Sequence, residues 1–395
     1  MSAGTVDYDI VIAGAGLVGL ALARALADSG MSIALVDRAE LTTPDPPTSD
    51  GDWDARVYAI SPGSAAFLQS LSAWQALPHG RIAPIESMRV EGDAGALLNF
   101  SAYELGERAL ATIVEERALR AALVPIVRSS GIAIHAPTEF ASLSFSPERA
   151  VLHCAGGRLL SARLIVGADG IRSWVRRAAG VGTVTRSYGQ TAVVANFECE
   201  RGHRGRAYQW FIEGGGVLAW LPLPGRRISI VWAAPDALAQ ELLALSAEAL
   251  AARVAAAGRH TLGAFICITP CARFPLQSVE TQTVVAHRLA LVGDAAHGVH
   301  PLAGQGVNLG FGDAAALATI LKGRGSLSDP GAPLLLARYA RRRAEPVLAM
   351  QKVTDALARL FGSTTPGVRA ARNFGMAVLE RMPPAKRFLA ASALR

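Results

Sequence analysis

Three glycines near the start of the chain have the spacing of a nucleotide-binding turn. The segment Gly14-Ala15-Gly16-Leu17-Val18-Gly19 follows an apolar run and opens a run rich in Ala and Leu. Such glycines allow a tight turn, the close approach of a pyrophosphate and close helix–strand packing, and the phosphates then lie on the amides of the helix N-terminus. The motif predicts a dinucleotide site formed by Gly14, Gly16, Leu17, Val18 and Gly19.

An aspartate follows at the distance that this site requires. Asp37 ends a second apolar run, Ser32 to Val36, and is placed to bond a ribose hydroxyl, with Arg38 beside it. The GxGxxG motif alone also occurs as a plain glycine turn, but its place between two strands, with Asp37 after the second, makes it specific. The pattern predicts dinucleotide binding and does not separate NAD from FAD.

Two further aspartates follow buried strands. Asp169 lies in Val166-Gly167-Ala168-Asp169-Gly170, and Asp294 lies in Val292-Gly293-Asp294-Ala295-Ala296-His297. Aspartates at the carboxyl ends of two strands of one sheet can converge on one extended ligand, although each alone could be an ordinary turn residue. We predict that Asp169 and Asp294 contact the same cofactor as the glycine turn.

The elements that must position these residues are of two kinds. Apolar strands of a buried parallel sheet are expected at 8–13, 32–36, 162–168 and 289–292, and helices at 20–27, at 105–130 and from 311 onward. Alternating strands of an antiparallel sheet are expected at 191–199, 208–212, 217–222 and 227–232. The fold class is therefore α/β, a discontinuous Rossmann-like domain with an inserted antiparallel β-sheet domain and a helical C-terminus.

These segments divide the chain into three parts. The nucleotide-binding domain is expected to comprise residues 1–75, 100–183 and 266–340, the inserted sheet domain residues 76–99 and 184–265, and the helical C-terminal region residues 341–395. The inserted sheet is expected to cover the cofactor and to form the wall of the substrate site.

The composition excludes several classes of protein. The 395 residues are 51% hydrophobic and 18% charged, which is typical of a globular chain. The net charge of +7 comes almost entirely from arginine, without a block of like charges, so no nucleic-acid partner is expected. Four scattered cysteines favour a reducing compartment, and Cys267 and Cys271 lack the spacing of a metal site, so no metal is expected.

No segment has the properties of a signal peptide or a membrane span. Ile10 to Ala23 is apolar, but Asp7 and Asp9 precede it where a signal peptide requires positive charge. It is also shorter than the roughly 20 residues that cross a bilayer. We expect a cytoplasmic protein, and a peripheral contact with the inner membrane is compatible with the sequence.

The combination of motifs resembles the class A flavoprotein monooxygenases, whose best-known fold is that of para-hydroxybenzoate hydroxylase. The resemblance implies that the glycine turn holds the ADP half of FAD, that Asp169 lies near FAD and the nicotinamide cofactor, and that Asp294 binds the ribityl chain. A second strand-linked GxGxxG is missing. This fits a class in which NAD(P)H meets the flavin in a groove and has no Rossmann domain of its own.

A narrower resemblance covers essentially the whole chain. The stretch from His300-Pro301-Leu302 through Gly312-Asp313 is similar to the signature of the ubiquinone-biosynthesis hydroxylases, and Asp54 to Ser61 is similar to that family's DxRxxALS segment. The resemblance implies FAD contacts by Arg56 and Arg117, either of which could instead be an ordinary surface arginine. It also implies flavin contacts along the glycine-rich stretch, by Pro301, Gly304, Gln305, Gly306, Val307 and Asn308.

The resemblance implies an FAD-dependent aromatic-ring monooxygenase. Flavin reduced by a reductant such as NAD(P)H would react with O2 to give a C4a-hydroperoxide, which hydroxylates a polyprenylated phenol or quinol precursor of ubiquinone. His297 and His300 are nearest in sequence to the flavin loop and are candidates for a base, with Pro301 beside the ring. A lone histidine is more often structural, so none of these residues is assigned as catalytic.

Three other functions share much of this pattern. They are a class A hydroxylase of a soluble phenol or secondary metabolite, a flavin reductase of isoprenoid chains, and a non-enzymatic prenyl-lipid carrier with a relic FAD fold. A prenylated substrate would be met at a membrane surface or within a ubiquinone-biosynthesis complex. The C-terminal region mixes apolar and basic residues, which suits an anionic interface, although a helix packed on the domain explains the pattern equally well. These residues are Leu360, Phe361, Phe374, Met376, Leu379, Met382, Phe388 and Leu389, with Arg369, Arg372, Arg381, Lys386 and Arg387.

Overall fold

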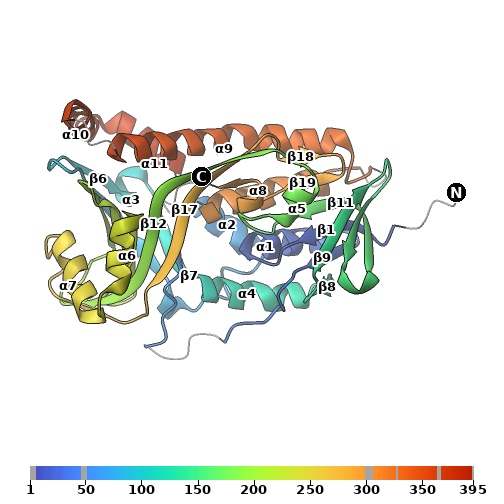
Figure 1. The fold of residues 1–395 in the computed structure, drawn as a ribbon, viewed down its shortest axis with the longest axis horizontal. Helices are drawn as coiled ribbons and strands as arrows, with labels where there is room; N and C mark the ends of the chain where they lie inside the picture. The colour runs from blue at the N-terminus through green and yellow to red at the C-terminus, as the bar shows by residue number, and fades with distance from the viewer. Residues whose placement is uncertain (1–5, 46–50, 299–305, 326–327, 363–365, 394–395) are drawn as a thin grey trace.

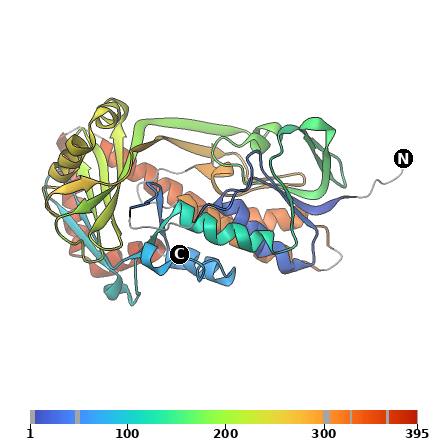
Figure 2. The same cartoon turned by 90° about the horizontal axis from the view of Figure 1, so that it is seen from below.

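The computed structural model describes residues 6–45, 51–298, 306–325, 328–362 and 366–393 (Figure 1). Two large sheets lie toward opposite ends of an elongated molecule, and the long strands β12 (Thr183–Cys199) and β17 (Ala272–Thr281) run from one end toward the other (Figures 1 and 2). The long helix α9 (Pro333–Gly362) lies along the same direction.

A parallel sheet forms the nucleotide-binding end. Its strands run in the order β19-β11-β1-β2-β8, with β1 in the centre. Their apolar residues are buried on both faces, as expected for a parallel sheet, with Ile10 and Ile12 packed against helices and Val11 and Ala13 packed on the opposite face. The strands are β1 (Tyr8–Ala13), β2 (Ile33–Val36), β8 (Ala133–His135), β11 (Leu159–Gly167) and β19 (Leu289–Leu291). The antiparallel strands at the edges of this sheet are β9 (Phe140–Phe145), β10 (Ala150–Cys154) and β18 (Val285–Ala286).

Helices cover this sheet and define where its site opens. The core under one face contains residues of α1 (Leu17–Leu26), α4 (Glu116–Arg128) and α8 (Gly306–Lys322). The other face packs against α5 (Trp174–Ala178) and the β9–β10 hairpin. The glycine turn, which joins β1 to α1, therefore opens at the carboxyl ends of the parallel strands, where ligands bind in such folds.

The antiparallel sheet forms the other end of the molecule. Its strands run in the order β20-β17-β12-β15-β14-β13-β5-β6, and β16 pairs with β12. The neighbouring strands are antiparallel except β13 and β5, which pair in parallel. One face carries large aromatic side chains packed under α6 (Asp236–Ala244) and α7 (Ala247–Ala257). The other face is apolar and carries alanine and valine residues together with larger ones such as Phe211 and Phe274. The remaining strands are β5 (Ser87–Glu91), β6 (Leu97–Ser101), β13 (Arg206–Ile212), β14 (Gly216–Leu223), β15 (Arg227–Pro235), β16 (Phe265–Cys267) and β20 (His297–Gly298).

A small sheet joins the two ends and corrects one prediction. It consists of β3 (Val57–Ile60), β7 (Ala111–Glu115) and β4 (Ala83–Ile85), with α2 (Pro62–Ser70) and α3 (Ala102–Leu105) nearby in sequence. The helix predicted over 105–130 is wrong in its first part, because residues 111–115 form β7 and α4 begins only at Glu116. Three consecutive β-branched residues in β7 and its pairing on both sides outweigh the helical composition of the window.

The C-terminal region is helical, as predicted, and docks on the antiparallel sheet. It contains α9, α10 (Pro366–Glu380) and α11 (Pro383–Ala393). Arg372 and Asn373 of α10 hydrogen-bond the buried carboxylate of Asp93, in the turn between β5 and β6. Met376 packs into the apolar cluster beneath the same strands.

The predicted fold class is confirmed, because a parallel Rossmann-like sheet, an inserted antiparallel sheet and a helical C-terminus are all present. The predicted domain boundaries stay a prediction. Strand pairing assigns residues 272–281, which were expected in the nucleotide-binding domain, to the antiparallel sheet, because β17 pairs along most of β12.

Candidate functional site

The glycine turn between β1 and α1 is closely packed except at Gly16. Gly14 has a φ of +114°, and a Cβ there would lie 2.3 Å from the Ala168 carbonyl oxygen. A Cβ on Gly19 would lie 1.9 Å from the Gly14 carbonyl oxygen, so both positions require glycine. A Cβ on Gly16 would meet no atom within 4 Å. Since α1 also has no side-chain cap, its first amides face open space that suits a phosphate group.

Asp37 holds this turn from the end of β2. Its Oδ2 accepts a hydrogen bond from the Ala15 amide at 2.6 Å, and its Oδ1 accepts one from the Ala39 amide at 2.8 Å. Arg38 is exposed beside it. The Asp37 carboxylate therefore stabilises the turn, and its bond to a ribose hydroxyl stays a prediction.

One arginine of α4 contacts the turn, and it is missing from the predicted set. Arg117 pairs with the Asp52 carboxylate through Nη1 at 2.8 Å. Arg120 lies one helical turn further on and donates a hydrogen bond from Nη1 to the Ala15 carbonyl at 3.1 Å. Residues three apart share a helix face, so the spacing of Arg120 from Arg117 is the signal that could have identified it.

Asp169 serves as a helix cap. Its Oδ1 accepts the Ser173 hydroxyl at 2.5 Å, and its Oδ2 accepts the amides of Trp174 and Val175 at 2.6 and 3.0 Å. These bonds satisfy the first amides of α5, which is the structural role that turn chemistry offers such a residue. Its neighbours Ala168 and Gly170 line the large cavity described below, so the loop borders the site although the Asp169 carboxylate is occupied.

Asp294 stands in the cavity beside the start of α8. It lines the cavity together with Gly306 and Val307, and a Cβ on Gly306 would lie 3.9 Å from its Oδ1. The surface of the side chain is open to the cavity. Protein nevertheless surrounds the cavity at this point and replaces much of the water that would solvate the carboxylate. Desolvation raises the pKa of Asp294, and the nearby charges of His297 and Arg56 only partly oppose this shift.

His297 belongs to a buried network centred on Asp313. Its Nε2 lies 2.7 Å from Asp313 Oδ2, which also accepts the Gly293 amide at 2.8 Å, while Arg343 donates from Nε to Oδ1 at 2.5 Å. Burial alone would raise the pKa of Asp313, but the charges and hydrogen bonds of His297 and Arg343 outweigh burial and hold it below its usual value. His297 is not among the described residues that line the cavity. This placement suits a positioning role for His297 better than the role of a base.

Asn308 connects α8 to the end of β3. Its Oδ1 accepts the Ser61 amide at 2.9 Å, and its Nδ2 donates to the Ala59 carbonyl at 2.8 Å. The side chain predicted to face the flavin is thus bonded to protein in this structure, and its flavin contact stays a prediction. His300, Pro301, Gly304 and Gln305 lie outside the described residues.

A cavity of about 710 Å³ connects the two ends of the molecule. At the nucleotide-binding end it reaches Gly16, Leu17 and Val18, and at the other end it is bounded by the apolar face of the antiparallel sheet. On that sheet the lining residues include Ala192, Val194, Ala207, Val217, Ala219, Val231 and Ala233. One continuous space therefore joins the glycine turn to an apolar wall that can receive an aromatic ring.

The cavity also contains a group of interacting polar side chains from α4, from β3 and from the residue before β3. Arg56 Nε lies 2.8 Å from Glu116 Oε2, and the guanidinium lies 5.5 Å from the Tyr58 ring centroid and 5.2 Å from that of Phe274. The Tyr58 hydroxyl lies 3.4 Å from Glu116 Oε2. Burial, and next the Glu116 carboxylate, raise the pKa of Tyr58 well above its usual value. Arg56 was predicted here, whereas Tyr58 and Glu116 were missed because no spacing in the sequence brings the two segments together.

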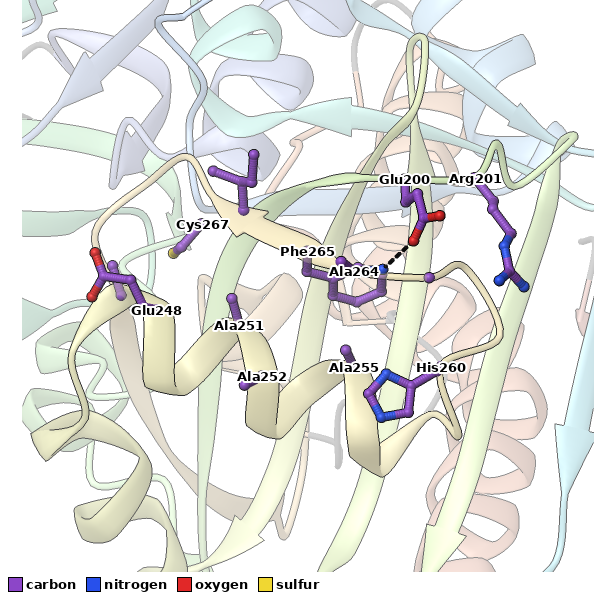
Figure 3. A pocket seen from close by; sticks show the side chains of 13 residues that line it. Glu200, Arg201, Glu248, Ala251, Ala252, Ala255, His260, Ala264, Phe265 and Cys267 are labelled. Carbon is purple, nitrogen blue, oxygen red and sulfur yellow. Dashed lines mark hydrogen bonds between the residues drawn. The ribbon is translucent and has the colours of Figure 1, made fainter.

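A second cavity, of about 540 Å³, is lined by none of the predicted site residues that the structure describes (Figure 3). It is formed between α7 and the segment leading into β16, with Ala251, Ala252 and Ala255 on the helix. Glu200 accepts the Ala264 amide at 3.0 Å at its border. It shares no lining residue with the cavity at the glycine turn. Among the described residues, no group of three His, Cys, Asp or Glu side chains could hold a metal ion.

Comparisons with known proteins match this geometry. The family described as FAD binding domain matches residues 7–354. A ubiquinone hydroxylase, UbiL, from Rhodospirillum rubrum is 39% identical over 98% of this chain and 89% of its own length. The 3-demethoxyubiquinol 3-hydroxylase of Escherichia coli is 34% identical over 96% of each chain. The mitochondrial ubiquinone biosynthesis monooxygenase COQ6 of Danio rerio is 31% identical over 98% of this chain and 89% of its own length.

Solved structures share the fold at lower sequence identity. PqsL from Pseudomonas aeruginosa, in complex with 2-aminobenzoylacetate, has a TM-score of 0.75 at 23% identity and covers 93% of this chain and 99% of its own. HpxO from Klebsiella pneumoniae, complexed with FAD and uric acid, has a TM-score of 0.74 at 18% identity and covers 97% of this chain and 96% of its own. The chain belongs to the FAD-dependent monooxygenases, in the family of the ubiquinone-biosynthesis hydroxylases.

Proposed function

We propose that this protein hydroxylates an aromatic ring of a polyprenylated phenol or quinol precursor in ubiquinone biosynthesis, with NAD(P)H and O2 as co-substrates. The observation that carries the proposal is the cavity that joins the glycine turn to the apolar face of the antiparallel sheet. Relatives named for ubiquinone hydroxylation support this substrate class over a soluble phenol, an isoprenoid reductase or a lipid carrier without activity.

The residues present fit FAD. Gly16 leaves open space before the uncapped N-terminus of α1, where a pyrophosphate is stabilised by amides and the helix dipole. Arg120 lies at the same turn, and Asp294, Gly306 and Val307 line the cavity further along. These residues would hold FAD, which supplies the reaction with oxygen when it is bound.

The remaining cavity residues would position the substrate and exclude water. The small side chains of the sheet leave room for a ring and offer it an apolar surface. In the described part of the chain, the carboxyl and hydroxyl groups lining the cavity belong to Glu116, Asp294 and Tyr58. The carboxylates of Glu116 and Asp294 are therefore the described acceptors inside the cavity for a proton that leaves a phenol, whereas His297 is bonded to Asp313 outside it.

Complementation of bacterial strains that each lack one ubiquinone hydroxylase tests this proposal. We expect restoration of ubiquinone in at least one strain, and we expect the restored strain to identify the ring position. Restoration in none of the strains, together with NAD(P)H oxidation stimulated by a soluble phenol, would favour the soluble-phenol hydroxylase instead.

We further propose that the protein meets its substrate at an anionic membrane surface through α10. Of the apolar residues expected there, Met376 and Leu379 pack on the antiparallel sheet, and the basic residues Arg372 and Lys386 are paired with carboxylates. Phe374, Val378 and Met382 are spaced by four and are 72%, 37% and 49% exposed. Among the described residues no helix is long and apolar enough to cross a membrane.

This stripe supports peripheral binding. Phe374 and Val378 lie four apart on one side of α10, and Met382 follows shortly after the helix ends. Exposed Arg381 and Arg387 lie close to them in sequence. Apolar side chains beside arginines suit the headgroup region of an anionic leaflet. Phe361, Phe388 and Leu389 belong to side chains outside the described set.

A further inference from the structure

Gln209 is a buried polar residue on the apolar sheet face of the large cavity. It lies in the middle of β13 and is 7% exposed. Its strand neighbours Tyr208 and Trp210 pack on the opposite face, in the aromatic core under α6 and α7. Because side chains alternate along a strand, Gln209 projects to the cavity side, and it lines the cavity.

The surroundings of Gln209 on this wall are apolar. Its partners across the strands are Ala219 on β14 and Val90 on β5. Ala207, Val217 and Leu221 line the cavity nearby. Among the residues that the structure describes, Gln277 on β17 is the other glutamine that lines the cavity, and it is only half-buried.

The side-chain amide of Gln209 has no hydrogen-bond partner among the described residues. The backbone N–H and C=O groups of β13 are bonded in the ladders with β14 and β5. The side-chain amide is therefore the polar group of Gln209 that is available to a ligand. The residue is largely buried, but its amide is not enclosed by protein and reaches the cavity space. When a ligand fills the cavity, an amide that is left without a partner weakens binding, so this position suits a polar group of a ligand.

We propose that the Gln209 amide recognises an uncharged oxygen substituent on the aromatic ring that the cavity holds, and so sets the orientation of that ring. An amide both donates and accepts, so it can bond a phenolic hydroxyl in either sense. No arginine, lysine or histidine of the described residues lines the sheet side of the cavity, and Arg56 on the other side is paired with Glu116. The described part of the wall therefore offers no counter-charge to an acidic substituent, which favours a neutral ring. This inference rests on the proposed function, because it takes the ligand to be an oxygenated aromatic ring.

A pair of ligands of nearly equal shape tests the inference. We would measure the dissociation constants of ortho-prenylphenol and ortho-prenyltoluene from the change in flavin absorption, in FAD-loaded wild-type protein, in Gln209→Met and in Gln209→Leu. The preference for the phenol over the toluene should be about tenfold smaller in both variants than in the wild type, because the buried amide that the toluene leaves unpaired is gone. Gln240→Met, at an exposed site on α6, provides the matched control and should keep the wild-type preference.

Stability separates recognition from a structural role. Because the amide makes no bond within the described protein, Gln209→Met should unfold at the same temperature as the wild type or at a higher one, with full FAD content. Lower stability or loss of FAD in Gln209→Met would assign the residue to the fold and overturn the inference. An unchanged preference in the Gln209 variants would overturn the inference alone. If neither ligand perturbs the wild-type flavin, the proposed function fails and the inference fails with it.

Discussion

His297 Nε2 lies 2.7 Å from Asp313 Oδ2, and both side chains are buried. The same oxygen accepts a hydrogen bond from the Gly293 amide. Asp313 of α8 therefore bonds Gly293, which precedes Asp294, and His297, which follows it in the chain. Arg343 of α9 completes the network on Oδ1. One carboxylate on α8 thus fixes a cavity residue in place without touching the cavity itself.

Asp313→Ala should therefore act mainly on stability. Removing the carboxylate leaves His297 and Arg343 buried without their partner, which costs about 3–5 kcal/mol of unfolding free energy. Urea unfolding measures this loss, with Asp28→Ala as the control because Asp28 forms an exposed pair with Arg24 on the surface. An effect of Asp313→Ala no larger than that of Asp28→Ala would contradict the role of the network.

The same carboxylate predicts a dependence on acid. The folded-state pKa of Asp313 is lowered, so its stabilisation is present above the unfolded pKa of about 3.9 and is lost as pH falls through the lower folded value. The advantage of wild type over Asp313→Asn should shrink as pH falls below about 4. A constant difference down to pH 2 would be inconsistent with the lowered pKa.

Asp294 should behave in the opposite way, because it is a cavity residue whose folded-state pKa is raised. Its favourable contribution is present below the unfolded pKa and is lost as pH rises through the folded value. At neutral pH, apoprotein carrying Asp294→Asn should be more stable than wild-type apoprotein, and the difference should vanish toward about pH 4. The variant should still bind FAD about tenfold more weakly, because a contact to the cofactor is altered. Equal FAD affinity would remove the cofactor role.

The glycine turn offers a test that separates cofactor binding from folding. Gly16→Val places its side chain where no protein atom lies, so the protein should fold with an unchanged unfolding midpoint but should be purified without FAD. Gly14→Val meets the Ala168 backbone and a left-handed φ, so it should lose stability as well as FAD. Full flavin occupancy in Gly16→Val would show that the phosphates bind elsewhere.

Sedimentation with anionic liposomes tests the exposed apolar residues of α10 and of the turn that follows it. In the double variant, both Phe374 and Met382 are replaced with serine. Most of this variant should move from the pellet to the supernatant at low salt, because the apolar contact with the membrane is lost while the fold is kept. Leu159→Ser is the matched control, since Leu159 is exposed on the nucleotide-binding sheet away from α10. If wild type stays in the supernatant, or if the double variant sediments equally, the membrane proposal is wrong.

The sequence predicted the parts of the site that depend on local pattern. The turn from Gly14 to Gly19, the strand before it and Asp37 follow from spacing alone, and the structure places them as expected. Tyr58, Glu116 and Gln209 escaped prediction because strand and helix packing brings together segments that are distant in the chain. The strand at 111–115 was hidden inside a helical composition, because its partners β3 and β4 lie elsewhere in the sequence.

The central claim is that the protein inserts one oxygen atom from O2 into an aromatic ring. The direct measurement is mass spectrometry of the product formed from ortho-prenylphenol by the FAD-loaded protein with NADPH under 18O2. We predict a product heavier by one 18O atom, formed only when O2, reductant and FAD are all present. NADPH oxidation that yields only hydrogen peroxide, or a product whose added oxygen comes from water, would contradict the account.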